Sequence, residues 1–216
     1  MTDPTIYVIR NEVDPDMRFH CDALTGQLPG ATELDYVAGD RVSLDGADGV
    51  VLTGSTAAVY ESESRPWIDD QMRLVRSLVD ADVPTLGVCF GHQIVNAALG
   101  GTVEHVGTTA TLVEATLAED PLFDGVDPVV VSLHGDIVTE PGDRMAVIAA
   151  AHHAPVFGTR HEDAPVWTVQ FHPELDGTHR EKLDAFGWTC GEFDFGDVSA
   201  ARLFGNFERI VRDRTP

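Results

Sequence analysis

The stretch Thr85-Leu-Gly-Val-Cys-Phe-Gly-His-Gln93 constrains the fold of this chain more than any other part of the sequence. The apolar side chains of residues 85–88 predict a short buried strand, and residues 94–99 continue with helix-forming side chains until the glycines at 100 and 101. Cys89 stands where the predicted strand stops and the predicted helix starts. The sequence therefore predicts a sharp strand-to-helix turn with a cysteine at its tip.

Gly87 and Gly91 lie two residues on either side of Cys89, and so sharp a turn leaves little room for neighbouring Cβ atoms. This layout is typical of a nucleophile elbow, which holds a reactive side chain exposed on a strained turn. The helix N-terminus would favour the thiolate, the form of cysteine that attacks carbonyl carbon. The alternative is that Cys89 is a small buried hydrophobe, as free cysteines often are.

Length and composition favour one cytoplasmic domain that spans residues 1–216. The chain is 43% hydrophobic but has no apolar run approaching 18 residues, and its polar start, Met1-Thr-Asp-Pro4, lacks the features of a signal peptide. Cys21, Cys89 and Cys190 are widely spaced without a C-x-x-C pair, so no disulfide framework or zinc ribbon is predicted.

The charge balance is strongly acidic, with 36 acidic and 14 basic residues and a formal net charge of −22. Such a chain repels nucleic acid, because polyanion binding needs clustered lysine or arginine, and Lys182 is the only lysine. The acidic residues are scattered, as on a solvated folded surface. We expect a protein adapted to high salt, which is a hypothesis about habitat and not about function.

The order of the predicted elements indicates an α/β fold. Strands are predicted at 5–9, 31–37, 49–53 and 85–88, and helices at 17–28 and after Pro66, where Ile68, Met72, Val75 and Val79 form an apolar stripe. This alternation predicts a mostly parallel central sheet with helices on both faces. Ligands bind such sheets beyond the carboxyl ends of the strands, where Thr53, Gly54 and Cys89 fall.

After Gly101 the pattern changes. Apolar runs at 111–117, 128–133 and 145–151 predict further strands, either of the same sheet or of an added antiparallel ribbon. Residues 198–211 predict a closing amphipathic helix.

Residues 166–172 alternate in the β manner, which places Gln170 and His172 on one face. Pro173 favours an extended conformation at His172, and residues two apart in an extended chain share a side, so Glu174 can hydrogen-bond His172. A cysteine hydrolase needs such a base and a group that orients it. The alternatives are a satisfied strand-end histidine and a solvated carboxylate.

Gly87-Val-Cys-Phe-Gly-His-Gln93 and Gln170-Phe-His-Pro-Glu174 closely resemble the two signature motifs of class I glutamine amidotransferases. The resemblance covers roughly residues 6–174 and is closest to the glutaminase domain of GMP synthetase and its stand-alone relatives. It implies the flavodoxin-like fold of that family. It also implies that Cys89 is the nucleophile, His172 the base and Glu174 its orienting group.

The resemblance implies further roles around this triad. The backbone amides of Gly54 and Phe90 would form the oxyanion hole. Gln93 corresponds to a substrate-binding glutamine. The segment Ser132-Leu-His-Gly-Asp136 resembles the one that holds the α-amino and α-carboxylate groups of glutamine, which makes His134, Gly135 and Asp136 candidate substrate contacts.

Two features depart from the family pattern. Thr53-Gly-Ser-Thr56 stands where the synthetase usually has Gly-Gly-Pro, and residues 175–196 form an insertion before the last helix. The aromatic residues of the insertion would be ordinary core, cover the active site or dock a partner; they are Trp188, Phe193 and Phe195. Three further histidines, His152, His153 and His161, have no metal-ligand spacing and are interpreted as non-catalytic.

The sequence thus predicts a glutaminase that releases ammonia, without a cofactor or a metal. No G-x-x-x-x-G-K-[ST] loop is present, so a separate ATP-dependent synthetase subunit, such as that of GMP synthetase, would use the ammonia. The alternative is a stand-alone γ-glutamyl hydrolase or peptidase, which needs the same triad. A third possibility is a regulatory module without turnover.

Overall fold

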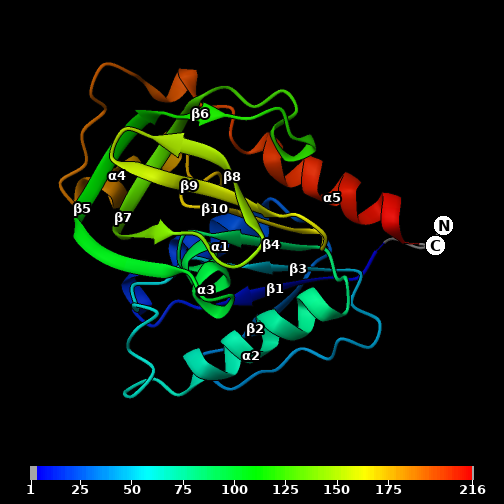
Figure 1. Cartoon of the computed structure of the whole chain (residues 1–216). Helices are drawn as coiled ribbons and strands as arrows, with labels where there is room; N and C mark the ends of the chain where they lie inside the picture. Colours follow the sequence, from blue (N-terminus) through cyan, green and yellow to red (C-terminus); the bar gives the residue numbers. More distant parts are fainter. Residues whose placement is uncertain (1–3, 216) are drawn as a thin grey trace.

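The computed structural model describes residues 4–215, and its strands form one sheet (Figure 1). The strand order is β2 (Thr32–Asp35), β1 (Ile6–Arg10), β3 (Gly49–Leu52), β4 (Thr85–Val88), β10 (Val166–Val169), β9 (Ala154–His161), β7 (Val129–Glu140) and β5 (Thr102–Glu114). Beside this path, β8 (Met145–Ala151) pairs with β9 and with the short β6 (Thr116–Leu117).

The five strands β2, β1, β3, β4 and β10 are parallel, as the sequence predicts. The strands that join beyond β10 are antiparallel. Both interpretations of the later strands therefore hold in part. These strands belong to the same sheet, and they join it in antiparallel orientation.

Helices cover both faces of the parallel strands. Side chains of successive strand residues point to opposite sides of the sheet, and on each side they are apolar and pack against helices. Ile9 and Val50 pack with residues of α2 (Trp67–Asp80) and α3 (Phe90–Ala98), whereas Val8 and Val51 pack with residues of α1 (Phe19–Gly26) and α5 (Arg202–Arg214). In Figure 1, α2 and α5 lie on opposite sides of the central strands. The predicted α/β architecture is confirmed.

Several elements are shorter than the sequence patterns indicate. The helix expected at 17–28 begins at Phe19, because Pro15–Met17 forms a 3₁₀ turn (η1) that the Asp14 side chain caps. The helix expected at 198–211 begins only at Arg202, after a second capped turn, η4 (Phe195–Asp197). The strand expected to reach His172 ends at Val169, where the chain turns into the site.

Residues 175–196 fold into η3 (Gly177–His179), α4 (Arg180–Asp184) and a loop. The Trp188 ring stacks on Phe195, with centroids 5.7 Å apart, and both pack in a cluster that includes Val131 of β7. Phe193 is partly buried against the same cluster. Trp188 is therefore a core side chain, as the first interpretation expects, whereas Phe193 and Phe195 pack against this core and stay partly exposed.

Two further observations complete the fold. A 3₁₀ turn, η2 (Pro121–Phe123), follows β6 and packs against α5. Between residues 4 and 215, no helix combines the length and the apolar character needed to cross a bilayer.

Candidate active site

Cys89 occupies the tight turn between β4 and α3, with φ of 52° and ψ of −104°. Its N–H donates to the carbonyl of Val169 at 2.8 Å, and its carbonyl accepts the N–H of Gln93 at 3.0 Å. A Cβ on Gly87 would lie 2.4 Å from the Gly91 carbonyl oxygen, so no side chain fits there. The sequence therefore folds into the predicted elbow, and a positive φ at a non-glycine residue is the strain expected of it.

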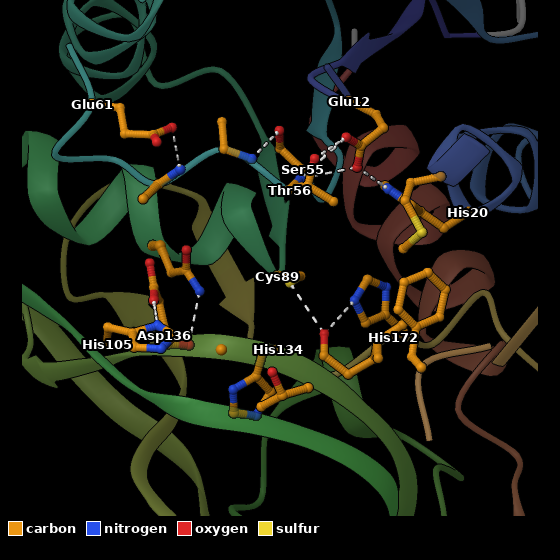
Figure 2. A pocket seen from close by; sticks show the side chains of 18 of the residues that line it. Glu12, His20, Ser55, Thr56, Glu61, Cys89, His105, His134, Asp136 and His172 are labelled. Atoms are coloured by element: carbon orange, nitrogen blue, oxygen red, sulfur yellow. Dashed lines mark hydrogen bonds and ion pairs between the residues drawn. The ribbon is translucent and has the colours of Figure 1, made fainter. Parts of the chain in front are cut away.

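His172 and Glu174 lie together beside Cys89. The Nδ1 atom of His172 is 2.6 Å from a Glu174 carboxylate oxygen, and both side chains are buried. The Nε2 atom of His172 lies 3.1 Å from the Leu133 carbonyl oxygen, to which the Cys89 thiol also donates at 3.8 Å. Figure 2 shows Cys89 and His172 converging on this point.

The surroundings of His172 favour its protonated form. Burial by itself lowers the pKa of His172, but the Glu174 carboxylate and the Cys89 sulfur raise it well above its ordinary value. The arrangement thus brings together a thiol, an imidazole and a carboxylate in the order that a nucleophile, its base and an orienting group would need.

A cavity of about 380 Å³ opens in front of the cysteine. Six of the residues that the sequence predicts line it: Cys89, Gln93, His134, Gly135, Asp136 and His172. Gly54, Phe90 and Glu174 are not among the lining residues. Gly54 is close to the site, since a Cβ there would lie 3.2 Å from the His172 ring and 3.5 Å from the Cys89 Cβ atom. Within residues 4–215, neither the Gly54 nor the Phe90 amide has a hydrogen-bond partner.

Gln93 links the elbow to β7. Its side-chain amide donates to the Asp136 carbonyl at 3.0 Å and to the Gln170 side-chain oxygen at 3.3 Å. Gln170 in turn donates to the Cys89 sulfur at 3.6 Å. The Asp136 carboxylate lies 2.7 Å from Nδ1 of His105 at the cavity rim.

His134 contacts a histidine for which the sequence predicted no part in the site. The His134 and His153 rings stack with centroids 5.2 Å apart, and their Nε2 atoms are 3.2 Å apart. Burial and the nearby histidines lower the pKa of His134 to about 3, so it is neutral at pH 7. His161 has a different role, because its Nδ1 accepts the amides of Asp163 and Ala164 in a turn.

Glu12 and His20 are cavity residues that the sequence patterns did not predict. They form a buried pair, with Nε2 of His20 2.8 Å from a Glu12 oxygen. Glu12 follows the carboxyl end of β1 by two residues, and this position at the ligand-binding edge of a parallel sheet was the one available signal.

One group of side chains could approach a metal ion. Ligand atoms of His20, His172 and Glu174 lie within 4.8 Å of one another. Each imidazole already bonds a carboxylate, His20 that of Glu12 and His172 that of Glu174. One nitrogen of each ring is therefore already occupied by a carboxylate.

Comparisons with known proteins show the family to which the chain belongs. Residues 31–187 match the family described as "Glutamine amidotransferase class-I". A chain of Methanopyrus kandleri that is named as one subunit of GMP synthase [glutamine-hydrolyzing] is 33% identical over 154 residues, which are 68% of this chain and 78% of the relative. GMP synthase of Lactobacillus delbrueckii subsp. bulgaricus is 27% identical over 173 residues, 73% of this chain, but the match spans only 32% of that longer protein.

Two solved structures share the fold. A putative GMP synthase subunit from Thermoplasma acidophilum has a TM-score of 0.73 at 21% identity, covering 99% of this chain and 96% of the other. A glutamine amidotransferase from Thermotoga maritima has a TM-score of 0.73 at 18% identity, covering 97% of both chains. With the family match over most of the sequence, the chain belongs to the class I glutamine amidotransferases.

Proposed function

We propose that this chain hydrolyses the side-chain amide of glutamine through a Cys89–His172–Glu174 triad and releases ammonia. The observation that carries the proposal is the convergence of the Cys89 sulfur and His172 Nε2 on one carbonyl, with Glu174 on the other ring nitrogen. The family match supports the same chemistry.

The reaction would begin when the Cys89 thiolate attacks the δ-carbon of glutamine. The free amides of Gly54 and Phe90 are the groups available to stabilise the negative oxygen of the tetrahedral intermediate. His172 would then protonate the leaving nitrogen, so that ammonia departs and a glutamyl thioester remains. Water, deprotonated by His172, would attack the thioester, releasing glutamate and regenerating Cys89.

The far wall of the cavity would hold the amino-acid end of the substrate. Gly135 and Asp136 lie there with His134, and Gln93 fixes their strand through the Asp136 carbonyl. The carboxylates of Asp136 and Glu61 both line the cavity and suit the α-ammonium group. His134 also lines the cavity, and its buried Nδ1 atom has no hydrogen-bond partner among the described residues.

The ammonia acceptor would belong to another protein. We propose a separate ATP-dependent synthetase subunit of the GMP synthetase type. The similarity to a relative that is named as one subunit of such an enzyme supports this proposal. The cavity rim carries exposed Tyr60 and Phe186, which suit a docking surface. Such a reaction fits the cytoplasmic location and the single domain of residues 1–216, with 175–196 as an insertion, that the sequence predicts.

The mechanism is tested with the purified chain and its Cys89→Ala variant. Wild type should release glutamate and ammonia from glutamine and show a covalent adduct on Cys89 by mass spectrometry, whereas Cys89→Ala should show neither. Full activity in the variant would overturn the mechanism. An assay with γ-glutamyl dipeptides separates the alternatives: preference for the dipeptides identifies a γ-glutamyl hydrolase, and no adduct with either substrate favours a regulatory module.

The partnership is tested by a pull-down from native high-salt extract. A recovered ATP-dependent protein that stimulates glutaminase activity would support the proposed partnership. Full activity on a γ-glutamyl compound, with no partner recovered and no stimulation, would overturn it.

A further inference from the structure

Glu12 forms an unusually complete set of contacts for a buried carboxylate. It accepts hydrogen bonds from Nε2 of His20 at 2.8 Å, the Asp14 amide at 2.8 Å, the Thr56 amide at 3.0 Å and the Thr56 hydroxyl at 2.6 Å. Figure 2 shows Glu12 between Thr56 and His20. Glu12 thus ties α1 to the loop that follows β3.

This loop is the one that carries Gly54. Gly54 lies between two imidazoles, because a Cβ built on it would be 3.2 Å from the Cε1 atoms of both His20 and His172. The His20 ring meets the His172 ring edge to face, with centroids 5.7 Å apart. His20 therefore buttresses both the backbone of Gly54 and the ring of His172.

The other side of the loop is also fixed. The Thr53 hydroxyl accepts the Asn11 amide at 3.0 Å and the Cys21 thiol at 3.4 Å. Residues 11 and 12 after β1 and residues 20 and 21 of α1 therefore clamp the loop from two directions. The clamp leaves the Gly54 amide next to Cys89 without a partner among residues 4–215.

We propose that Glu12 and His20 are positioning residues of the acylation site, which hold the loop 53–56 so that the Gly54 amide meets the carbonyl oxygen of a substrate bound to Cys89. The inference rests on the proposed function for the identity of the physiological substrate. It does not require glutamine for its test, since the loop should serve any acyl group that reaches Cys89.

Stability alone does not explain this pair. A buried ion pair is often no more stabilising than apolar side chains of the same volume. Burial lowers the pKa of His20, but the hydrogen bonds that its ring donates to Cys21 and Glu12 outweigh burial and raise this pKa to about 9, so the pair is charged at neutral pH. Glu12 and His20 also face the cavity beside Cys89, where a purely structural pair is not needed.

The test compares two reactions of Cys89 that differ in their need for an oxyanion hole. Acylation by p-nitrophenyl acetate places negative charge on a carbonyl oxygen, whereas alkylation by iodoacetamide is a displacement at carbon and forms no oxyanion. Acylation is measured as nitrophenol release above the Cys89→Ala background. Alkylation is measured at the Cys89 peptide by mass spectrometry, which separates it from Cys21 and Cys190.

We expect Glu12→Gln and His20→Gln to slow acylation at least about 10-fold while alkylation stays within about 3-fold, because a misplaced oxyanion-hole donor costs a large part of its contribution. Thr56→Val, which removes one contact of Glu12 from a more exposed position, should give a smaller loss of the same kind. If Glu12→Gln or His20→Gln prevents folding, Thr56→Val still provides the test.

Asp120→Asn is the matched control. Asp120 is a buried carboxylate that binds Arg160 and the Trp167 ring nitrogen away from the cavity. Its substitution should lower the melting temperature and leave both reactions unchanged.

Unchanged acylation in folded Glu12→Gln and His20→Gln would overturn the proposal, and so would equal losses of acylation and alkylation. If the wild-type chain undergoes both reactions but releases no ammonia from glutamine, the proposed function fails while the test of Glu12 and His20 stands.

Discussion

The ring of His172 is fixed by more than its carboxylate. Its backbone N–H donates to the Val131 carbonyl at 2.8 Å, and its Nε2 atom lies 3.1 Å from the Leu133 carbonyl oxygen. Two contacts with β7 would therefore remain if Glu174 were lost. Glu174 contributes mainly its charge and one hydrogen bond to Nδ1.

Glu174→Gln should therefore be less damaging than His172→Ala. We expect His172→Ala to reduce kcat for glutamine about as much as Cys89→Ala, and Glu174→Gln to lose about two orders of magnitude less, because members of a catalytic unit contribute unequally and non-additively. Steady-state ammonia release from the three variants checks this order. Equal losses for Glu174→Gln and His172→Ala would contradict it.

The raised pKa of His20 predicts that the free energy of unfolding depends on pH. Because its pKa is raised to about 9 in the folded chain from an ordinary 6.5, its contribution is fully present below pH 6.5 and is lost as the pH rises through about 9. The free-energy difference between wild type and His20→Gln should shrink between pH 6 and pH 9.5, by at most about 3 kcal/mol. Urea unfolding at fixed salt measures it, and parallel pH curves would refute it.

The sequence could predict Cys89, His172 and Glu174 because local spacing determines where they lie. Glycines flank the cysteine, and a strand end followed by proline brings the carboxylate beside the histidine. Glu12 and His153 could not be predicted in this way. Each meets its partner only through long-range packing, Glu12 with Thr56 across β1 and β3, and His153 with His134 across two antiparallel strands.

At the scale of elements, the elbow depends on how closely α3 approaches β3. A Cβ on Gly91 would lie 2.4 Å from the Leu52 carbonyl oxygen, a backbone atom that cannot move aside. The same approach places Cys89 beside the loop after β3. The glycine pattern in the sequence therefore reflects close packing between elements, which explains why it predicted the sharp turn at Cys89.

Gly91→Ala should destabilise the chain by about 2–3 kcal/mol or more, because the added methyl forces α3 away from β3. Gly205→Ala is the matched control, since Gly205 is also helical but exposed, with no atom within 4 Å of an added Cβ. That change should be neutral or stabilise by up to about 1 kcal/mol. Urea unfolding of both variants measures the two effects. Similar stabilities would show that the close approach of α3 to β3 does not require glycine at position 91.

Element ends were the least predictable part of the fold. Asp14 caps a short 3₁₀ turn that delays the start of α1, and the extended Val198 after the turn capped by Asp194 precedes the late start of α5. A side-chain cap competes with helix propensity over only a few residues, so hydrophobic periodicity cannot reveal which one prevails.

At the scale of the whole molecule, the arginines do little to offset the acidic surface. Most already contact a carboxylate: Arg10, Arg18, Arg41, Arg65, Arg73, Arg144, Arg160, Arg180 and Arg209. With 36 acidic and 14 basic residues, many carboxylates are left without a cationic partner. The folded chain concentrates this charge and is opposed by self-repulsion.

The free energy of unfolding should therefore rise with salt. Screening of exposed charges is largely complete once the Debye length falls to about 3 Å near 1 M salt, so the steepest gain is expected between about 0.01 and 1 M KCl. Urea unfolding across this series measures the effect, and sucrose series at low salt control for solute effects that do not depend on ions. A further rise above 1 M, beyond what screening supplies, would support adaptation to high salt. Unchanged stability from molar to low salt would refute that hypothesis.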